Sequence, residues 1–110
     1  MASAENDIKR AVLDLCKRLG IPATRHQSGA VLVGGHKVVM GEAGWPDIIG
    51  VLPDGRFLGI ECKTVTGRVE DTQIDRLMRL SECGAVVLVT RDIDEIARDL
   101  RDLLTAIRAR

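Results

Sequence analysis

The stretch Gly44–Thr64, GWPDIIGVLPDGRFLGIECKT, decides the fold that we expect for this chain. Residues 47–52 and 56–62 form two mostly apolar runs, and the Pro-Asp-Gly triplet between them is typical of a turn. The pattern predicts a β-hairpin, which brings residues far apart in the sequence side by side.

Three charged residues share this hairpin: Asp47, Glu61 and Lys63. Because side chains alternate between the faces of a strand, Glu61 and Lys63 lie on one face and Cys62 points to the other. A two-residue loop would pair Asp47 with Cys62, on the wrong face. An odd-length loop, such as three residues with Gly55 in a left-handed conformation and a bulge, would pair Asp47 with Lys63. We predict the odd loop.

Two carboxylates on one patch of an apolar hairpin repel each other and are costly to desolvate unless a cation lies between them. Carboxylate oxygens favour Mg²⁺ or Mn²⁺, ions that also bind substrate phosphate. The pattern therefore indicates a metal site, with a lysine beside it that can position water or stabilise charge on phosphorus. The alternative is a surface ion-pair cluster of Asp47 or Glu61 with Lys63.

The chain resembles the VRR-NUC (virus-type replication-repair nuclease) domain family of the PD-(D/E)XK nuclease superfamily. The resemblance covers nearly the whole chain and follows the family's order and spacing. The matching residues are Arg25, Ser28-Gly29, Gly44, Pro46-Asp47, Gly55-Arg56-Phe57, Ile60-Glu61, Lys63-Thr64, Gly67, Gln73 and Gly84-Ala85, and Glu5 fits the acid of the family's first helix.

The resemblance implies a small α/β nuclease-like fold, a mixed β-sheet with a central hairpin flanked by α-helices. It implies a metal-dependent endodeoxyribonuclease in which Asp47 and Glu61 bind Mg²⁺ or Mn²⁺. The backbone carbonyl of Cys62 is a further implied ligand, and Lys63 would position or activate water. The family commonly has Val where this chain has Cys62, a mild change because cysteine also suits a buried apolar position.

Gln73 and Glu5 are the assisting residues that the resemblance implies. Gln73 would reach the metal-bound water or a phosphate, although with Glu70 it also has the spacing of a capping box at a helix start. Glu5 would join the metal ligands, although it also suits the positive end of its helix. The family often has Gln four residues after this acid, where the chain has Lys9, so the way Glu5 is held is open.

Branched DNA, such as a Holliday junction, is the substrate that the resemblance implies, with roles in replication, repair or recombination. Stand-alone family members act as homodimers, so a second copy is an expected partner, and a helicase or another replication protein is a further one. The competing hypothesis is a non-catalytic DNA-binding module of the same fold in a larger complex. A sequence-specific restriction enzyme is disfavoured because the chain has no room for a recognition domain.

The formal net charge is zero, but residues 8–40 are locally basic. This segment holds Lys9, Arg10, Lys17, Arg18, Arg25 and Lys37 against Asp14 alone. It is either a phosphate-contacting surface or a solvated helix face and loop. For DNA binding we favour Arg25, whose guanidinium suits phosphate, together with Lys9 and Lys37. With one Trp, one Phe and no Tyr, the chain lacks the rings of a single-strand stacking platform.

At 110 residues the chain is expected to be one domain, residues 1–110. No apolar run approaches the ~20 residues that span a bilayer, and residues 1–7 have no secretory signal, so we expect no membrane and a cytoplasmic site, bacterial or in a phage-infected host. The three cysteines, Cys16, Cys62 and Cys83, have no zinc-site spacing and are predicted to be buried free thiols. His26 or His36 could contact phosphate or assist in catalysis.

Hydrophobic periodicity predicts an α/β domain with helices on both faces of a mixed sheet. The predicted helices are 4–19, capped by Ser3, 70–83 and 92–108. Besides the central hairpin, the predicted strands are 23–27, 31–33, 37–40 and 85–90, the last buried on both faces.

Overall fold

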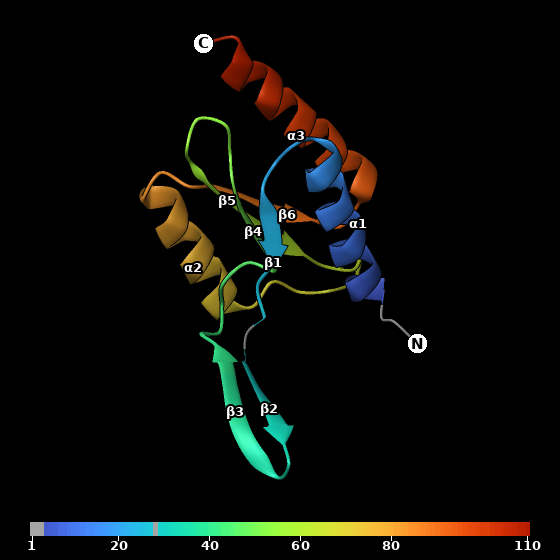
Figure 1. The fold of residues 1–110 in the computed structure, drawn as a ribbon, viewed down its shortest axis with the longest axis vertical. Coiled ribbons are helices and arrows are strands. Elements are labelled where there is room, and N and C mark those ends of the chain that lie inside the picture. Colours follow the sequence, from blue (N-terminus) through green and yellow to red (C-terminus); the bar gives the residue numbers. More distant parts are fainter. Residues whose placement is uncertain (1–3, 28) are drawn as a thin grey trace.

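The structure is a computed structural model that describes residues 4–27 and 29–110 (Figure 1). Its elements, in chain order, are α1 (Ala4–Arg18), β1 (Ala23–Arg25), β2 (Gly29–Val33), β3 (His36–Gly41), β4 (Ile48–Val51), β5 (Phe57–Cys62), α2 (Asp71–Glu82), β6 (Val86–Thr90) and α3 (Ile93–Arg108). The α/β class is confirmed, and each described element lies within about two residues of its prediction. Ser3, expected to cap α1, and Ser28, part of the resemblance, lie outside the described residues.

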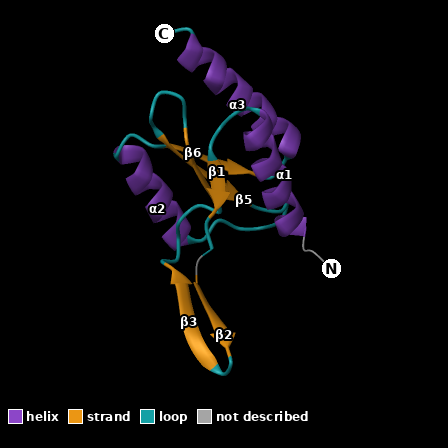
Figure 2. Ribbon diagram, in the orientation of Figure 1, coloured by secondary structure: helices purple, strands orange, loops and turns teal. Residues whose placement is uncertain are grey.

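The main sheet has the strand order β1-β4-β5-β6. The pairs β1–β4 and β4–β5 are antiparallel, whereas β6 runs parallel to β5. Helices α1 and α3 lie together on one side of this sheet and α2 lies on the other (Figure 2). None of the helices in the described part of the chain is long and apolar enough to cross a membrane.

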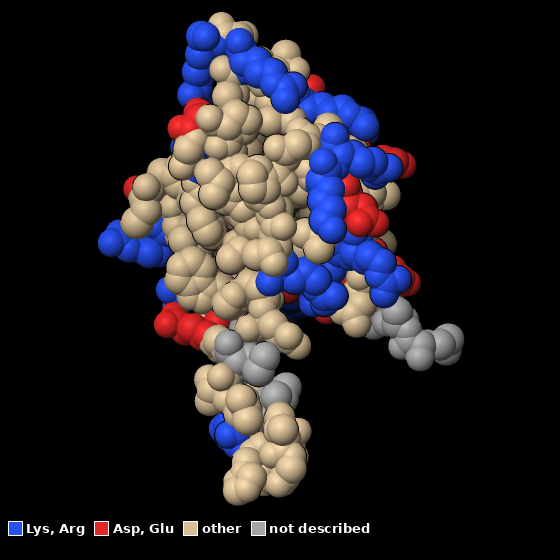
Figure 3. Space-filling model, viewed as in Figure 1, with Lys and Arg blue, Asp and Glu red and all other residues tan. Residues whose placement is uncertain are grey.

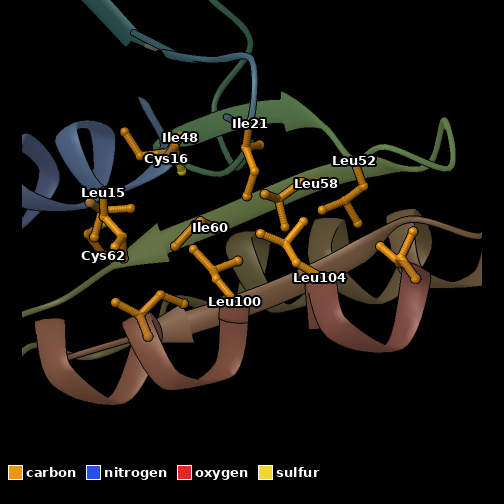
Figure 4. Close-up of a cluster of buried hydrophobic side chains, with 13 residues drawn as sticks. Leu15, Cys16, Ile21, Ile48, Leu52, Leu58, Ile60, Cys62, Leu100 and Leu104 are labelled. Carbon is orange, nitrogen blue, oxygen red and sulfur yellow. The ribbon is translucent and has the colours of Figure 1, made fainter. Parts of the chain in front are cut away.

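The hydrophobic core lies between the sheet and the α1–α3 pair (Figure 4). Alternate β5 residues, Leu58, Ile60 and Cys62, are fully buried there against Leu15 of α1 and Leu100 of α3. Because the side chains of a strand alternate, the intervening residue Glu61 points to the opposite face, toward α2. Core packing therefore fixes the side of the sheet on which the candidate site lies.

The β4–β5 connection is the predicted odd loop. Val51 pairs with Phe57, and the Leu52 N–H donates to the Arg56 carbonyl at 2.9 Å, so the turn consists of Pro53, Asp54 and Gly55, residues 53–55. Gly55 has a φ of +89°, the left-handed conformation expected of it.

The predicted partner of Asp47 is nevertheless wrong. Ile48 pairs with Ile60, and continuing this register places Asp47 opposite Glu61, two residues before Lys63. Pairing Asp47 with Lys63 requires a loop centred on Gly55, whereas the observed loop, residues 53–55, is centred on Asp54; moving the centre by one residue shifts every pair by two. The shift is an even number of residues, so Asp47 and Glu61 still share one face.

Strands β2 and β3 form a separate hairpin that projects from the body of the molecule (Figure 1). Its turn is the predicted Gly34-Gly35, with φ values of +57° and +81°. Leu32 and Val39 on this hairpin are 78% and 71% exposed. Figure 3 shows the hairpin as almost uncharged, whereas Lys and Arg gather on the side of the molecule formed by α1.

Two burial predictions are wrong. Strand β6 is at the edge of the described sheet, and its Val89 is 43% exposed instead of buried on both faces. Cys83 is exposed, whereas Cys16 and Cys62 are buried as expected. An apolar run alone does not distinguish an edge strand from a central one, which accounts for Val89. Cys83 is the C-cap residue of α2 and lies at the end of that helix instead of on its buried face.

Candidate active site

Asp47 and Glu61 form the centre of the candidate site. The two carboxylates come from opposite strands of the β4–β5 hairpin, Asp47 directly before β4 and Glu61 within β5. The Cys62 backbone N–H donates to Asp47 Oδ2 at 2.8 Å, which ties the Asp47 side chain to β5. The side chain of Glu61 is only 1% exposed and that of Asp47 is 18% exposed. The hairpin thus holds two acidic groups side by side, largely out of water.

Each oxygen of Glu61 has a different environment. Gln73 Nε2 donates to Glu61 Oε2 at 2.6 Å, and Lys63 Nζ lies 3.2 Å from the same oxygen. The other oxygen, Oε1, is buried and has no hydrogen-bond partner among the described residues. A buried carboxylate oxygen without a partner is costly, so a cation or water at Oε1 would stabilise the folded state.

The pKa of Glu61 is raised from 4.5 to about 7, first by burial and then by the negative charge of Asp47, and Lys63 opposes both effects. The ammonium of Lys63 therefore does not supply enough positive charge to offset burial and the neighbouring carboxylate. A divalent cation beside the two carboxylates would favour the ionised form of Glu61.

Gln73 bonds both to the start of its helix and to the candidate site, whereas its contact with a metal-bound water or a phosphate stays a prediction. Its Oε1 accepts a hydrogen bond from the Glu70 backbone N–H at 2.9 Å, which stabilises the start of α2. Its Nε2 donates to Glu61, which places the amide in the candidate site. The start of α2 is therefore bonded directly to the central carboxylate.

Glu5 and Lys9 reach the site from α1. Lys9 Nζ lies 3.4 Å from Asp47 Oδ1 and 3.9 Å from Glu5 Oε2. Glu5 Oε1 in turn lies 4.0 Å from Lys63 Nζ. Glu5 is thus part of the charged cluster, but the two lysines stand between it and the hairpin carboxylates.

A cleft of about 480 Å³ opens beside Asp47 and is lined by Asn6, Lys9, Arg25, His26, Gln27 and Asp47. Arg25 and Lys9, two of the residues predicted to bind DNA, are brought together there. Lys37, the third, lies on β3 of the projecting hairpin and does not line the cleft. His26 lines the cleft, whereas His36 begins β3.

Sequence reasoning missed Asn6 and Gln27 as cleft residues, and it missed the ion pair between Lys9 and Asp47. The signals were present. Asn6 precedes Lys9 by three residues on a helix, a spacing that makes them neighbours. Gln27 follows Arg25 by two residues in extended chain, which places both on one side.

The donor set fits one hard divalent cation. In the described part of the chain, no three carboxylate, imidazole or thiol groups come close enough together to form a ready metal cluster. Asp47 and Glu61 still offer hard oxygens, one of them unpartnered, and Mg²⁺ typically uses one or two carboxylates with water and substrate phosphate. The Cys62 thiol is not a candidate ligand, because it is buried in the core and burial above all raises its pKa to about 12.

Comparison of the chain with known protein families and with curated proteins finds no match in either. The assignment of a function therefore depends on the residues and their geometry.

Proposed function

We propose that this protein is a divalent-metal-dependent endonuclease that hydrolyses phosphodiester bonds in DNA. The observation that carries the proposal is the convergence of Asp47 and Glu61 with Lys63 and Gln73, next to a cleft that Asp47, Lys9 and Arg25 line. The same residues support the resemblance to the VRR-NUC family and to the PD-(D/E)XK fold.

In this proposal Asp47 and Glu61 hold Mg²⁺ or Mn²⁺, with the Cys62 carbonyl as a further ligand. When bound, the cation polarises a phosphoryl oxygen and lowers the pKa of a bound water. The environment of Glu61 suits metal binding for two reasons. Its Oε1 lacks a partner among the described residues, and the neighbouring Lys63 does not offset the effects of burial and of Asp47 on its carboxylate.

The chain's own residues orient the reactants. Arg25 and Lys9 contact phosphates in the cleft and set the position of the scissile bond. Lys63, 3.2 Å from Glu61, orients the attacking water and stabilises negative charge on phosphorus, and the Gln73 amide holds Glu61 in place. The water oxygen bonds to phosphorus, the bond from phosphorus to the leaving sugar oxygen breaks, and the proton lost by the water is balanced by one gained at that oxygen.

Branched DNA in replication, repair or recombination is the substrate that we propose, with two copies of the chain acting together. A four-way junction presents two strands to be cut, and a dimer of small subunits presents two sites. A helicase or another replication protein would be a further partner. Light scattering at increasing protein concentration tests the dimer independently of cleavage.

The test of the proposed function is cleavage of labelled duplex, flap and four-way-junction DNA with Mg²⁺, Mn²⁺ or EDTA. Lys63→Ala should lower cleavage at least about a hundredfold, because the charge beside the phosphorus is lost, while DNA binding is nearly unchanged. Lys17→Ala, which removes the same charge from an exposed position on α1, should cleave normally.

Each outcome separates the hypotheses. Paired metal-dependent cuts at the junction, absent in Lys63→Ala, would support a resolvase-like enzyme. DNA binding without cutting under every metal would favour the non-catalytic module instead, in which Lys9 and Lys63 serve only to neutralise the carboxylates. Full activity in Lys63→Ala would contradict the role assigned to this lysine.

A further inference from the structure

Lys9 occupies a position in which a cation is held by two carboxylates. Its ammonium lies 3.4 Å from Asp47 Oδ1 and 3.9 Å from Glu5 Oε2. Its side chain is only 18% exposed, so the ion pairs are partly shielded from solvent. Glu5 precedes Lys9 by one helical turn, the orientation in which such pairs stabilise a helix, so α1 itself holds the ammonium in place.

The net charge of this cluster limits the number of divalent cations that it can bind. Three carboxylates, of Glu5, Asp47 and Glu61, face two ammonium groups, of Lys9 and Lys63. One negative charge is therefore in excess. A single divalent cation reverses the sign of the cluster, and a second would have to be placed among positive charges at a separation where repulsion is strong.

Among the oxygens of Asp47 and Glu61, the one that is open to a metal ion lies on the Glu61 side of the pair. Asp47 Oδ2 accepts from the Cys62 N–H and Oδ1 faces Lys9, whereas Glu61 Oε1 has no partner among the described residues. The first divalent cation therefore fits beside Glu61. The place on the other side of Asp47, between it and Glu5, is taken by the Lys9 ammonium.

We infer that the ammonium of Lys9 takes the place of a second divalent cation, so that each chain binds one metal ion. The inference rests on the proposed nuclease function. An ammonium is a compact point charge that can neutralise Asp47 and attract a phosphate from the cleft that Lys9 lines, but it cannot bind water as a Lewis acid. Water activation is thereby confined to the Glu61 side.

Replacing Lys9 by an uncharged residue should open the second position. In Lys9→Gln, the vacated place is flanked by Asp47 Oδ1 and Glu5 Oε2, hard oxygens that suit Mn²⁺, and the excess negative charge is larger. The experiment counts Mn²⁺ bound per chain from the electron paramagnetic resonance signal of free Mn²⁺, up to millimolar metal. We expect one ion in the wild type and two in Lys9→Gln.

Two control variants test whether the loss of the Lys9 charge is what allows a second Mn²⁺ ion to bind. Lys9→Arg keeps a positive charge between the carboxylates and should bind one ion. Lys17→Gln removes the same charge from an exposed position on α1 and should also bind one. Circular dichroism of each variant checks that the fold is retained, because metal counts are compared only between folded chains.

The outcomes distinguish this inference from the proposed function. Two ions in the wild type, one ion at unchanged affinity in Lys9→Gln, or two ions in Lys9→Arg would overturn the role of Lys9 and leave a metal-dependent nuclease intact. No Mn²⁺ bound by any of the folded chains would overturn the proposed metal-dependent function, and this inference with it.

Discussion

Glu61 is the residue on which the chemistry of the candidate site depends. Its side chain is 1% exposed, it lies beside Asp47, and one of its oxygens has no partner among the described residues. Burial first, and then the charge of Asp47, raises the pKa of Glu61 from 4.5 to about 7. The folded metal-free protein therefore binds a proton at Glu61 more tightly than the unfolded chain does.

This difference predicts how stability depends on pH. Because the folded state favours protonated Glu61, the contribution of this group is fully present below about pH 4.5 and is lost as the pH rises through about 7. In EDTA, the free energy of unfolding of Glu61→Gln minus that of the wild type should therefore increase between these pH values. The expected increase is of order 3 kcal/mol, measured by urea unfolding at each pH.

The comparison with Glu61→Gln cancels the other titrating groups, most of which are retained in the variant. Saturating Mn²⁺ gives a second check, because a cation beside Glu61 should reduce the pH dependence of the wild type alone. A difference between the two proteins that stays constant from pH 4.5 to 7 would show that Glu61 titrates as an ordinary exposed carboxyl.

At the scale of elements, the sequence predicts that the β4–β5 loop has an odd number of residues. It does not predict which residues pair across the hairpin. The Pro-Asp-Gly turn and the need for one charged face required an odd loop, which is observed. The register follows from contacts within the turn: the Asp54 carboxylate accepts from the Arg56 backbone N–H at 3.2 Å and from Arg56 Nε at 2.7 Å. These bonds, together with an ion pair from Arg110, depend on atoms that the pattern of apolar residues does not describe.

Contacts between elements far apart in the sequence were the least predictable part of the site. The pairing of Lys9 with Asp47 requires α1 to be placed against the start of β4, which no local pattern of residues specifies. Gln73 was easier to place because two features of the sequence point to it, its capping-box spacing from Glu70 and its position in the resemblance to the VRR-NUC family. The residues of the candidate site were therefore easier to predict than the ion pairs that connect them.

The core and the projecting hairpin should differ sharply in their contribution to stability. Leu100 is fully buried between α3 and the sheet, whereas Leu32 on β2 is 78% exposed. Leu100→Ala should lower the free energy of unfolding by about 2–5 kcal/mol, because it leaves a cavity. Leu32→Ala should change it by less than about 0.5 kcal/mol.

The two substitutions remove the same atoms, so each serves as the control for the other in urea unfolding. A loss in Leu32→Ala comparable with that in Leu100→Ala would mean that the hairpin is covered in solution. Repeating the measurement at several protein concentrations would then show whether a second copy covers it, because only an intermolecular contact depends on concentration.

At the scale of the whole molecule, the zero net charge conceals an uneven distribution. Lys and Arg gather along the side formed by α1, where the cleft beside Asp47 also collects Lys9 and Arg25 (Figure 3). The projecting hairpin is almost uncharged, and its Lys37 does not line the cleft. Under the proposed function, DNA should therefore follow the cleft and not the hairpin.

This placement predicts that two residues expected from the sequence to bind DNA will behave differently. Arg25→Ala should weaken binding to junction DNA about tenfold, which corresponds to ~1.4 kcal/mol. It should also reduce the magnitude of the slope of log K against log salt concentration by about 0.9, the value for one lost phosphate contact. Lys37→Ala removes the same formal charge and should leave both quantities nearly unchanged. Fluorescence anisotropy in EDTA, over a range of salt concentrations, measures both. Equal losses in the two variants would instead place the DNA along β3 as well, and the substrate path would then have to include the projecting hairpin.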